Sequence, residues 1–89
     1  MTCLKWSDEA WDDYLWWQNQ DRKTYTKINN LIRDIMRHPT DGIGKPEPLM
    51  HQLSGYWSRR IDKANRIVYI YEEDADTVFI TQCKFHYNK

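Results

Sequence analysis

The sequence predicts an α+β fold in which an N-terminal helical hairpin packs on one face of a mainly antiparallel, twisted sheet. Two observations carry this prediction. Apolar residues recur every three to four positions up to Pro39, the period of an amphipathic helix, and later alternate every second position, the period of a strand. At 89 residues the chain has room for one hydrophobic core, so we expect a single domain spanning residues 1–89.

The N-terminal part is predicted as a short strand followed by two helices. Residues 2–6 form the candidate strand, and Ser7 is a natural N-cap because its hydroxyl can accept a hydrogen bond from the first helical turn. The first helix is predicted from Asp8 to about Gln18, with a turn at 19–21. The second helix ends before Pro39, and its apolar stripe is the clearest in the chain: Tyr25, Ile28, Leu31, Ile32, Ile35 and Met36. The short connection makes the pair an antiparallel hairpin.

The C-terminal part is predicted as a loop followed by strands. Residues 39–48 hold all three prolines and two of the three glycines, which indicates an ordered loop. A strand is predicted to start at 51–53, another covers 56–62, and 66–72 with 77–85 form a hairpin joined by an acidic turn. Both sides of the strand that starts at Arg66 are apolar, so the sequence leaves open which side meets the helices.

Charge and composition narrow the classes of partner. Thirteen Lys plus Arg balance thirteen Asp plus Glu, so no strong global field attracts a nucleic acid or a membrane. No stretch is long and apolar enough to span a bilayer, and we expect a cytoplasmic protein with no membrane partner. Cys3 and Cys83 lie far apart without a framework of spaced pairs, so both are expected to be buried, reduced thiols.

Glu47 is the first candidate for chemistry, because it stands between two prolines in KPEPL. Each proline has a fixed φ and drives the residue before it, Lys45 or Glu47, toward extended geometry. The carboxylate is therefore presented from a stiff segment, as a general base requires. The alternative is that the prolines only shape a loop and that Glu47 is a solvated surface residue.

The arginines of the predicted strands are candidates for phosphate binding. Strand alternation sends Arg59 and Arg60 to opposite faces, so only one of them can join Arg66. Guanidinium groups that converge on a sheet surface bind phosphate well, because each donates two parallel hydrogen bonds. The alternative is surface charge paired with Asp62 or with the acidic turn.

His86 and Tyr87 follow the last predicted strand. Histidine has a reference pKa of about 6.5, so it can give a proton to a leaving group near neutral pH. The alternative is an exposed residue near the chain end. Cys83 and His86 are spaced like metal ligands, but no CxxC pair or HExxH motif accompanies them. We therefore predict no metal and no cofactor.

A base, arginines and a histidine acid are the minimum set for cleaving RNA without a metal. RNA supplies its own nucleophile, since the 2′-hydroxyl lies beside the scissile phosphate. The base removes its proton, the cations stabilise the pentacoordinate intermediate, and the acid protonates the departing 5′-oxygen. The expected products carry a 2′,3′-cyclic phosphate and a 5′-hydroxyl.

Four segments, WSDEAWDDYLWW, GIGKPEPLMHQLSGYWSRRI, NRIVYIY and CKFHY, resemble the YoeB/Txe family of toxins in the RelE superfamily. The resemblance implies a RelE-like, microbial ribonuclease-like fold and the toxin of a bacterial type II toxin-antitoxin pair. It implies an mRNA interferase, an endoribonuclease that cleaves translated messages in the ribosomal A site. Its implied partners are the ribosome, mRNA, a YefM/Axe-type antitoxin that folds onto the toxin, and a second copy in a homodimer.

The resemblance also implies roles for individual residues. The family's general base falls on Glu47, its phosphate-stabilising arginine on Arg66, its general acid on His86, and its terminal tyrosine, which orients or stacks on a base, on Tyr87. Supporting RNA-binding positions fall on Lys45 and Arg59.

The chain departs from the family pattern at two places. Met50 stands where many relatives are expected to have a lysine, so one contact to phosphate or ribosomal RNA is missing or replaced. Asn88 and Lys89 extend past the usual terminal tyrosine.

Two other functions compete with the enzyme. One is a noncatalytic module that blocks translation by occupying ribosomal RNA through its basic face and its aromatic residues. The other is a protein that binds an antitoxin only to serve in transcriptional autoregulation.

Overall fold

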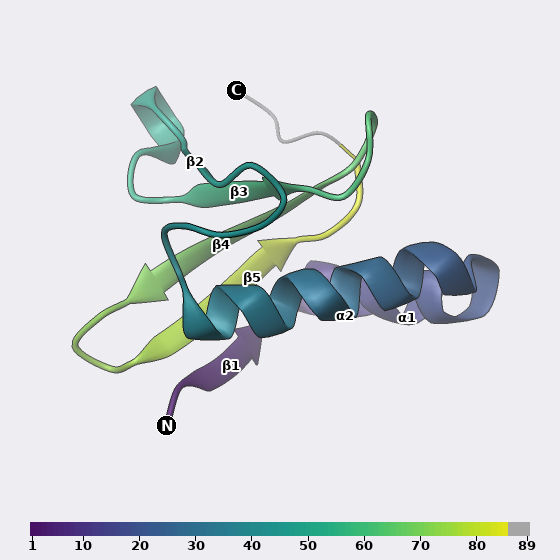
Figure 1. The fold of residues 1–89 in the computed structure, drawn as a ribbon, viewed down its shortest axis with the longest axis horizontal. Coiled ribbons are helices and arrows are strands. Elements are labelled where there is room, and N and C mark those ends of the chain that lie inside the picture. The colour runs from purple at the N-terminus through teal and green to yellow at the C-terminus, as the bar shows by residue number, and fades with distance from the viewer. Residues whose placement is uncertain (86–89) are drawn as a thin grey trace.

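The computed structural model describes residues 1–85, in which two helices pack against a five-stranded sheet (Figure 1). The sheet order is β1-β5-β4-β3-β2; β1 pairs parallel with β5, and the other neighbours are antiparallel. In chain order the elements are β1 Cys3–Trp6, α1 Asp8–Gln20, α2 Arg22–Arg37, β2 Glu47–Pro48, the 3₁₀ turn η1 His51–Leu53, β3 Trp57–Arg60, β4 Arg66–Glu72 and β5 Thr77–Gln82. The predicted α+β fold is confirmed.

The helical hairpin turns through a single residue. Ser7 caps α1 by accepting a hydrogen bond from the Ala10 N–H at 3.1 Å. Asp21 ends α1, because its N–H donates to the Trp17 carbonyl, and begins α2, because its carboxylate accepts from the Thr24 N–H and hydroxyl. The predicted turn at 19–21 is therefore too long, since one aspartate performs both capping roles.

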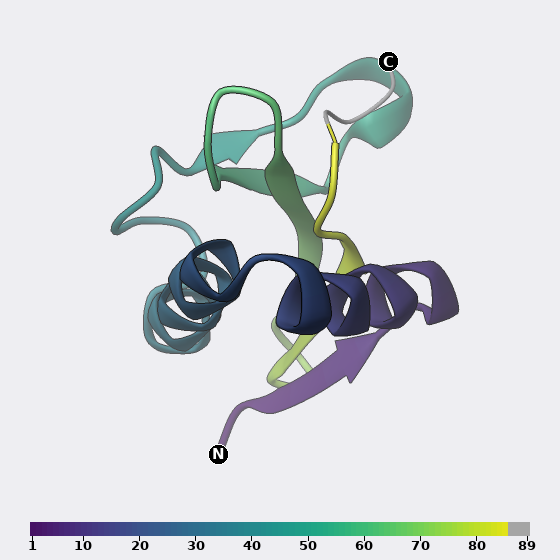
Figure 2. The same cartoon turned by 90° about the vertical axis from the view of Figure 1, so that its right-hand side faces the viewer.

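The core lies between the helices and one face of the sheet, and Figure 2 shows the two helices side by side. The chief contributions are Ile28, Leu31, Ile32 and Ile35 from α2 and Ile67, Tyr69, Val78 and Ile80 from β4 and β5. The sequence did not determine which side of β4 faces the helices. In the structure it is the side that carries Ile67 and Tyr69. Within residues 1–85, neither helix is apolar and long enough to cross a bilayer.

Three local predictions were wrong. Residues 51–53 form a 3₁₀ turn and not a strand, while the neighbouring β2 lies inside the predicted loop and pairs with β3. The last strand ends at Gln82 and not at Phe85. Cys83 is buried as expected, but Cys3 is exposed, because β1 lies at the edge of the sheet and only its last residue, Trp6, packs against the core.

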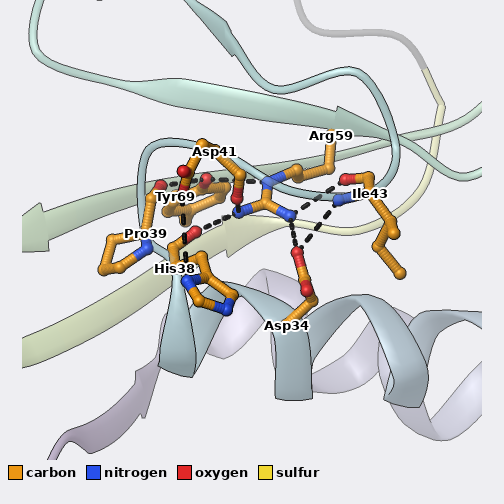
Figure 3. A network of polar contacts seen from close by, with 7 residues as sticks. All are labelled: Asp34, His38, Pro39, Asp41, Ile43, Arg59 and Tyr69. Carbon is orange, nitrogen blue, oxygen red and sulfur yellow. Dashed lines mark hydrogen bonds and ion pairs between the residues drawn. The ribbon is translucent and has the colours of Figure 1, made fainter.

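Arg59 on β3 is fully buried between the sheet and α2, where its guanidinium holds the loop after α2 (Figure 3). Its Nη1 donates to the Asp34 carboxylate at 2.6 Å and to the Ile43 carbonyl at 2.9 Å. Its Nη2 donates to the carbonyls of His38 and Asp41. The side chain therefore donates to one carboxylate and to three carbonyls at the end of α2 and in the loop that follows it.

The remaining donor of Arg59 faces Tyr69 on β4. Arg59 Nε donates to the Tyr69 hydroxyl at 3.1 Å, and that hydroxyl donates to the Pro39 carbonyl at 2.6 Å. With 0% of the side chain exposed, Arg59 cannot reach a phosphate, so its assignment as an RNA-binding residue is corrected to a structural one. The physical reason is strand alternation, which turns Arg59 toward the helices.

We expect Arg59→Ala to lower the free energy of unfolding by about 3–5 kcal/mol, the usual cost of removing one partner of a buried ion pair. The measurement is urea denaturation. Arg60→Ala is the matched control, because the neighbouring arginine is exposed and should change stability by no more than about 0.5 kcal/mol. Equal losses in the two variants would contradict the structural role of Arg59.

Asp34 makes part of this stability dependent on pH. Burial by itself raises the pKa of Asp34, but hydrogen bonds from Arg59 and the Ile43 N–H, with the Arg59 charge, outweigh burial and hold the pKa below its ordinary 3.8. A carboxyl whose pKa is lowered by folding stabilises the protein above its unfolded pKa and loses that contribution as pH falls through the folded pKa.

We therefore expect the stability difference between the wild type and Asp34→Asn to be constant from neutral pH down to about 5 and to shrink below pH 4. Denaturant titrations at several pH values measure it. Asp41→Asn changes an exposed carboxylate of the same loop, and its free energy of unfolding should vary with pH in the same way as that of the wild type. A difference that grows on acidification would refute the assignment.

Candidate active site

The face of the sheet opposite the helices carries the candidate site. In the β2–β3 register Glu47 is paired with Ser58, and in the β3–β4 register Arg60 is paired with Arg66. Side chains of paired residues lie on the same face, and so do residues two apart on one strand. The side chains of Glu47, Ser58, Arg60 and Arg66 therefore lie on one face of the sheet, opposite to the face that carries Arg59.

A groove of about 290 Å³ lies on this face. It is lined by Lys45, Pro46, Glu47, Ser58, Arg60 and Arg66. Three of the predicted site residues, Lys45, Glu47 and Arg66, are thus brought together although 21 positions separate the first from the last. The groove contains three cations and one carboxylate.

Glu47 is presented by a paired strand and not by a loose loop. Next to it, the Leu49 N–H donates to the Tyr56 carbonyl at 2.9 Å, which continues the pairing of β2 with β3. The extended geometry expected at Glu47 is confirmed, and its side chain is exposed to the groove. Within residues 1–85 the carboxylate forms no ion pair.

The expectation of extended geometry was wrong for Lys45, whose φ is 53°. The cause is the preceding turn, which brings Gly44 close to α2: a Cβ at Gly44 would lie 2.7 Å from Leu31 Cδ2. The Gly44 carbonyl accepts a hydrogen bond from the Arg60 N–H at 2.6 Å, which ties the loop to the end of β3. Lys45 is held beside Arg60 as a result.

Arg66 is anchored to the turn between β3 and β4. Its Nη1 donates to the carbonyls of Asp62 at 2.8 Å and Asn65 at 3.2 Å, while the Asp62 carboxylate is occupied by the turn itself. Neither Arg66 nor Arg60 forms an ion pair with a carboxylate inside the described range 1–85. Within residues 1–85 the structure therefore does not contain the alternative arrangement, in which these arginines form salt bridges with Asp62 or the acidic turn.

Arg60 also lines the groove, although the sequence predicted no role for it. Alternation already required that only one of Arg59 and Arg60 could join Arg66, and the resemblance favoured Arg59. The signal that could have decided it is the polarity of β4: Arg59 is paired with Ile67, a core residue, whereas Arg60 is paired with Arg66 itself.

His86 and Tyr87 lie outside the described residues. The chain that leads to them is described up to Phe85, whose carbonyl accepts a hydrogen bond from the Arg66 N–H at 3.0 Å. The described chain therefore ends beside Arg66, one of the residues that line the groove.

A wider hollow of about 820 Å³ adjoins Glu47 and is lined by residues 47–53. Met50, at the position where a lysine was expected, is one of the lining residues and is 73% exposed. A thioether offers a flexible apolar surface in place of a charge. This departure makes the surface next to Glu47 more apolar.

The described residues 1–85 contain no group of three His, Cys, Asp or Glu side chains arranged to hold a metal ion. Cys83, the one cysteine close to His86 in sequence, is buried, and burial together with the charge of Asp13 raises its pKa to about 12. Its thiol stays protonated at neutral pH.

The groove combines a proton acceptor with several fixed positive charges. Glu47 can remove a proton, and the guanidinium groups of Arg60 and Arg66 can donate hydrogen bonds to anionic oxygens from two neighbouring strands. Like charges placed opposite each other repel, so an anion bound between them relieves that repulsion. The arrangement suits a reaction that builds up negative charge on a phosphate.

Comparisons with known proteins agree over almost the whole chain. The sequence profile of the family described as "YoeB-like toxin of bacterial type II toxin-antitoxin system" matches residues 6–87. Toxin YoeB of Escherichia coli is 52% identical over 84 residues, which cover 94% of this chain and 98% of that protein. A solved YoeB/ParE toxin from Agrobacterium tumefaciens matches with a TM-score of 0.93 and 45% identity, over 97% of this chain and 100% of that one.

Two solved structures from Staphylococcus aureus are also similar, each with a TM-score of 0.87 and 40% identity. One is a heterotetrameric YoeB-YefM toxin-antitoxin complex, which covers 98% of this chain and 99% of its own. The other is a YoeB dimer, which covers 97% of this chain and 98% of its own. The match to the profile and the identity to the relatives leave one conclusion: the chain belongs to the family of YoeB-like toxins of bacterial type II toxin-antitoxin systems.

Proposed function

We propose that this protein is a ribosome-dependent, metal-independent endoribonuclease that cleaves mRNA in the ribosomal A site. The observation that supports it most is the single groove that holds Glu47 together with Lys45, Arg60 and Arg66. If Glu47 were only a solvated loop residue and the cations only surface charges, we would not expect them to line the same groove. The family assignment supports the same reading.

Glu47 removes the proton from the 2′-hydroxyl of the nucleotide on the 5′ side of the scissile bond. The 2′-oxygen then attacks the adjacent phosphorus, and the bond from phosphorus to the 5′-oxygen breaks. The electron pair of that bond leaves with the 5′-oxygen. The products end in a 2′,3′-cyclic phosphate and a 5′-hydroxyl.

Arg60 and Arg66 stabilise the negative charge that grows on the phosphoryl oxygens. Their positions on two hydrogen-bonded strands keep them in place before the substrate arrives, so little reorganisation is needed during the reaction. Arg66 is oriented further by its bonds to the turn carbonyls. Lys45 adds a positive charge at the groove edge and binds a neighbouring phosphate.

His86 gives its proton to the departing 5′-oxygen, and Tyr87 stacks on a base or orients it. The support for this assignment is the family resemblance and the end of the described chain at Phe85, which is hydrogen-bonded to Arg66. The apolar hollow beside Glu47, with Met50 at its rim, receives a flanking base.

The neutral net charge supports a reaction that needs the ribosome. A free ribonuclease captures RNA through a strong positive field, which this chain lacks overall. The ribosome instead holds the message in place, so the toxin must only recognise the occupied A site. The protein acts in the bacterial cytoplasm, where translated messages are found.

The partner that restrains the toxin is a YefM/Axe-type antitoxin, and the toxin pairs with a second copy of itself. This proposal is supported by the S. aureus relatives, one described as a YoeB-YefM complex and one as a YoeB dimer. An antitoxin segment that folds on binding can cover a large part of the toxin surface.

We expect Glu47→Gln to lower the cleavage rate by about 10²–10⁴-fold, the usual contribution of a general base, while antitoxin binding is kept. Primer extension on a translated message measures the cuts, and co-purification measures antitoxin binding. Glu73→Gln, an exposed glutamate in the turn before β5, is the matched control and should cut normally. If the wild type stops translation without creating new 5′ ends, the protein is a noncatalytic blocker.

A message that carries a 2′-deoxynucleotide on the 5′ side of the cut should resist cleavage completely, because it has no internal nucleophile. Ribosome complexes programmed with the deoxy and the ribo message are compared by gel, with the same substitution one codon upstream as the control. Cutting of the deoxy message at the same bond would show that water and not the 2′-oxygen attacks.

A further inference from the structure

Phe85, the last described residue, is held in an unusual backbone conformation by polar contacts on both sides. Its φ is 63°, in the left-handed region that residues with a side chain seldom adopt. Its N–H donates to Asn65 Oδ1 at 2.6 Å. Its carbonyl accepts from the Arg66 N–H at 3.0 Å and from Gln82 Nε2 at 3.2 Å.

Asn65 is itself fixed from the other side. Its Nδ2 donates to both carboxylate oxygens of Asp62, at 3.0 and 3.2 Å. Asp62 Oδ1 in turn accepts the N–H groups of Ala64 and Asn65, both at 2.8 Å. Contact with an acceptor on one side and a donor on the other allows the amide of Asn65 only one orientation.

Apolar burial does not explain why the chain stays in this conformation. The Phe85 side chain is 66% exposed, so little of its ring is removed from water. Lys84 Nζ lies over the rings of Trp16 and Phe85, which fixes side chains but not the Phe85 peptide. The hydrogen bonds of Asn65, Arg66 and Gln82 are what hold the strained residue.

The same short segment therefore contributes to the groove and holds the end of the described chain. Arg66 lines the groove beside Glu47, while the Asn65 side chain binds the Phe85 N–H and the Arg66 N–H binds the Phe85 carbonyl. A change in the backbone conformation of Phe85 changes the direction in which the chain continues after it. A turn of this kind sets where the C-terminal tail starts relative to the arginines.

We propose that Asn65 is a positioning residue, which directs the C-terminal tail so that His86 reaches the leaving oxygen of the phosphate bound by Arg66. The inference rests on the proposed function, because it assigns Asn65 to the protonation half of that reaction. Asn65 touches neither the substrate nor the reacting atoms and acts through Phe85.

We expect Asn65→Ala to lower kcat by up to about 100-fold, the cost of a misplacement of about 1 Å, and to leave KM within about twofold because the groove cations remain. Asn19→Ala is the matched control: Asn19 is an exposed asparagine of α1 whose amide bonds only the Leu15 carbonyl. Antitoxin binding and thermal unfolding are measured on both variants.

Two variants of Phe85 test the backbone without relying on the stability of the turn. Phe85→Gly keeps both peptide hydrogen bonds and adopts positive φ readily, so it should cut at close to the wild-type rate. Phe85→Pro has no N–H and a φ near −65°, so it should match the loss seen in Asn65→Ala. Equal activity of the glycine and proline variants would overturn the inference.

A substrate with a better leaving group identifies the step that fails. In a message whose 5′-bridging oxygen at the cut is replaced by sulfur, the leaving thiolate departs without a proton. The bond from phosphorus to sulfur breaks, and the need for an acid is lost. We expect this substrate to restore His86→Ala and Asn65→Ala to within about threefold of the wild type and to leave Glu47→Gln slow.

The outcomes separate the inference from the function beneath it. Restoration of His86→Ala but not Asn65→Ala would refute the positioning role and leave the ribonuclease intact. Failure to restore His86→Ala would refute the acid assignment itself. Loss of fold in Asn65→Ala is seen in thermal unfolding, and the two Phe85 variants then decide the matter.

Discussion

The buried contact between Arg59 and Asp34 is the constraint on which the rest of the site depends. It joins β3 to α2 and, through three carbonyls, holds the loop that leaves the helix. That loop delivers Lys45 and β2 to the edge of β3. A buried charge is costly unless every donor finds a partner, and within residues 1–85 no buried side-chain polar atom lacks one.

The two faces of β3 separate the core of the protein from the candidate site. Arg59 and Arg60 are neighbours in the chain, yet one is sealed in the interior and the other lines an open groove. Each face is supported by the adjacent strand, with Ile67 opposite Arg59 and Arg66 opposite Arg60. Adjacent residues of the same type therefore have different surroundings, because a strand turns successive side chains in opposite directions.

The groove holds more positive than negative charge, although the whole chain is neutral. Cations that face each other across strands destabilise a fold slightly, and an anion placed between them reverses the sign of that contribution. Such a site is better suited to a bound polyanion than to an empty groove. The local excess gives a chain of neutral net charge one place that favours an anion.

The sequence by itself determined the helices and the hairpin of β4 and β5, and it singled out Glu47, Lys45 and Arg66, which the fold brings to one groove. Periodicity, capping residues and prolines are local signals, so they can be read without coordinates. The tertiary structure decided what depends on contacts between distant segments. These features are the parallel pairing of β1, the face of β4 that meets the helices, the exposure of Cys3, the left-handed turn at Lys45, and which of Arg59 and Arg60 lines the groove. Alternation fixes that two arginines diverge, but only the position of the helices determines which one is buried.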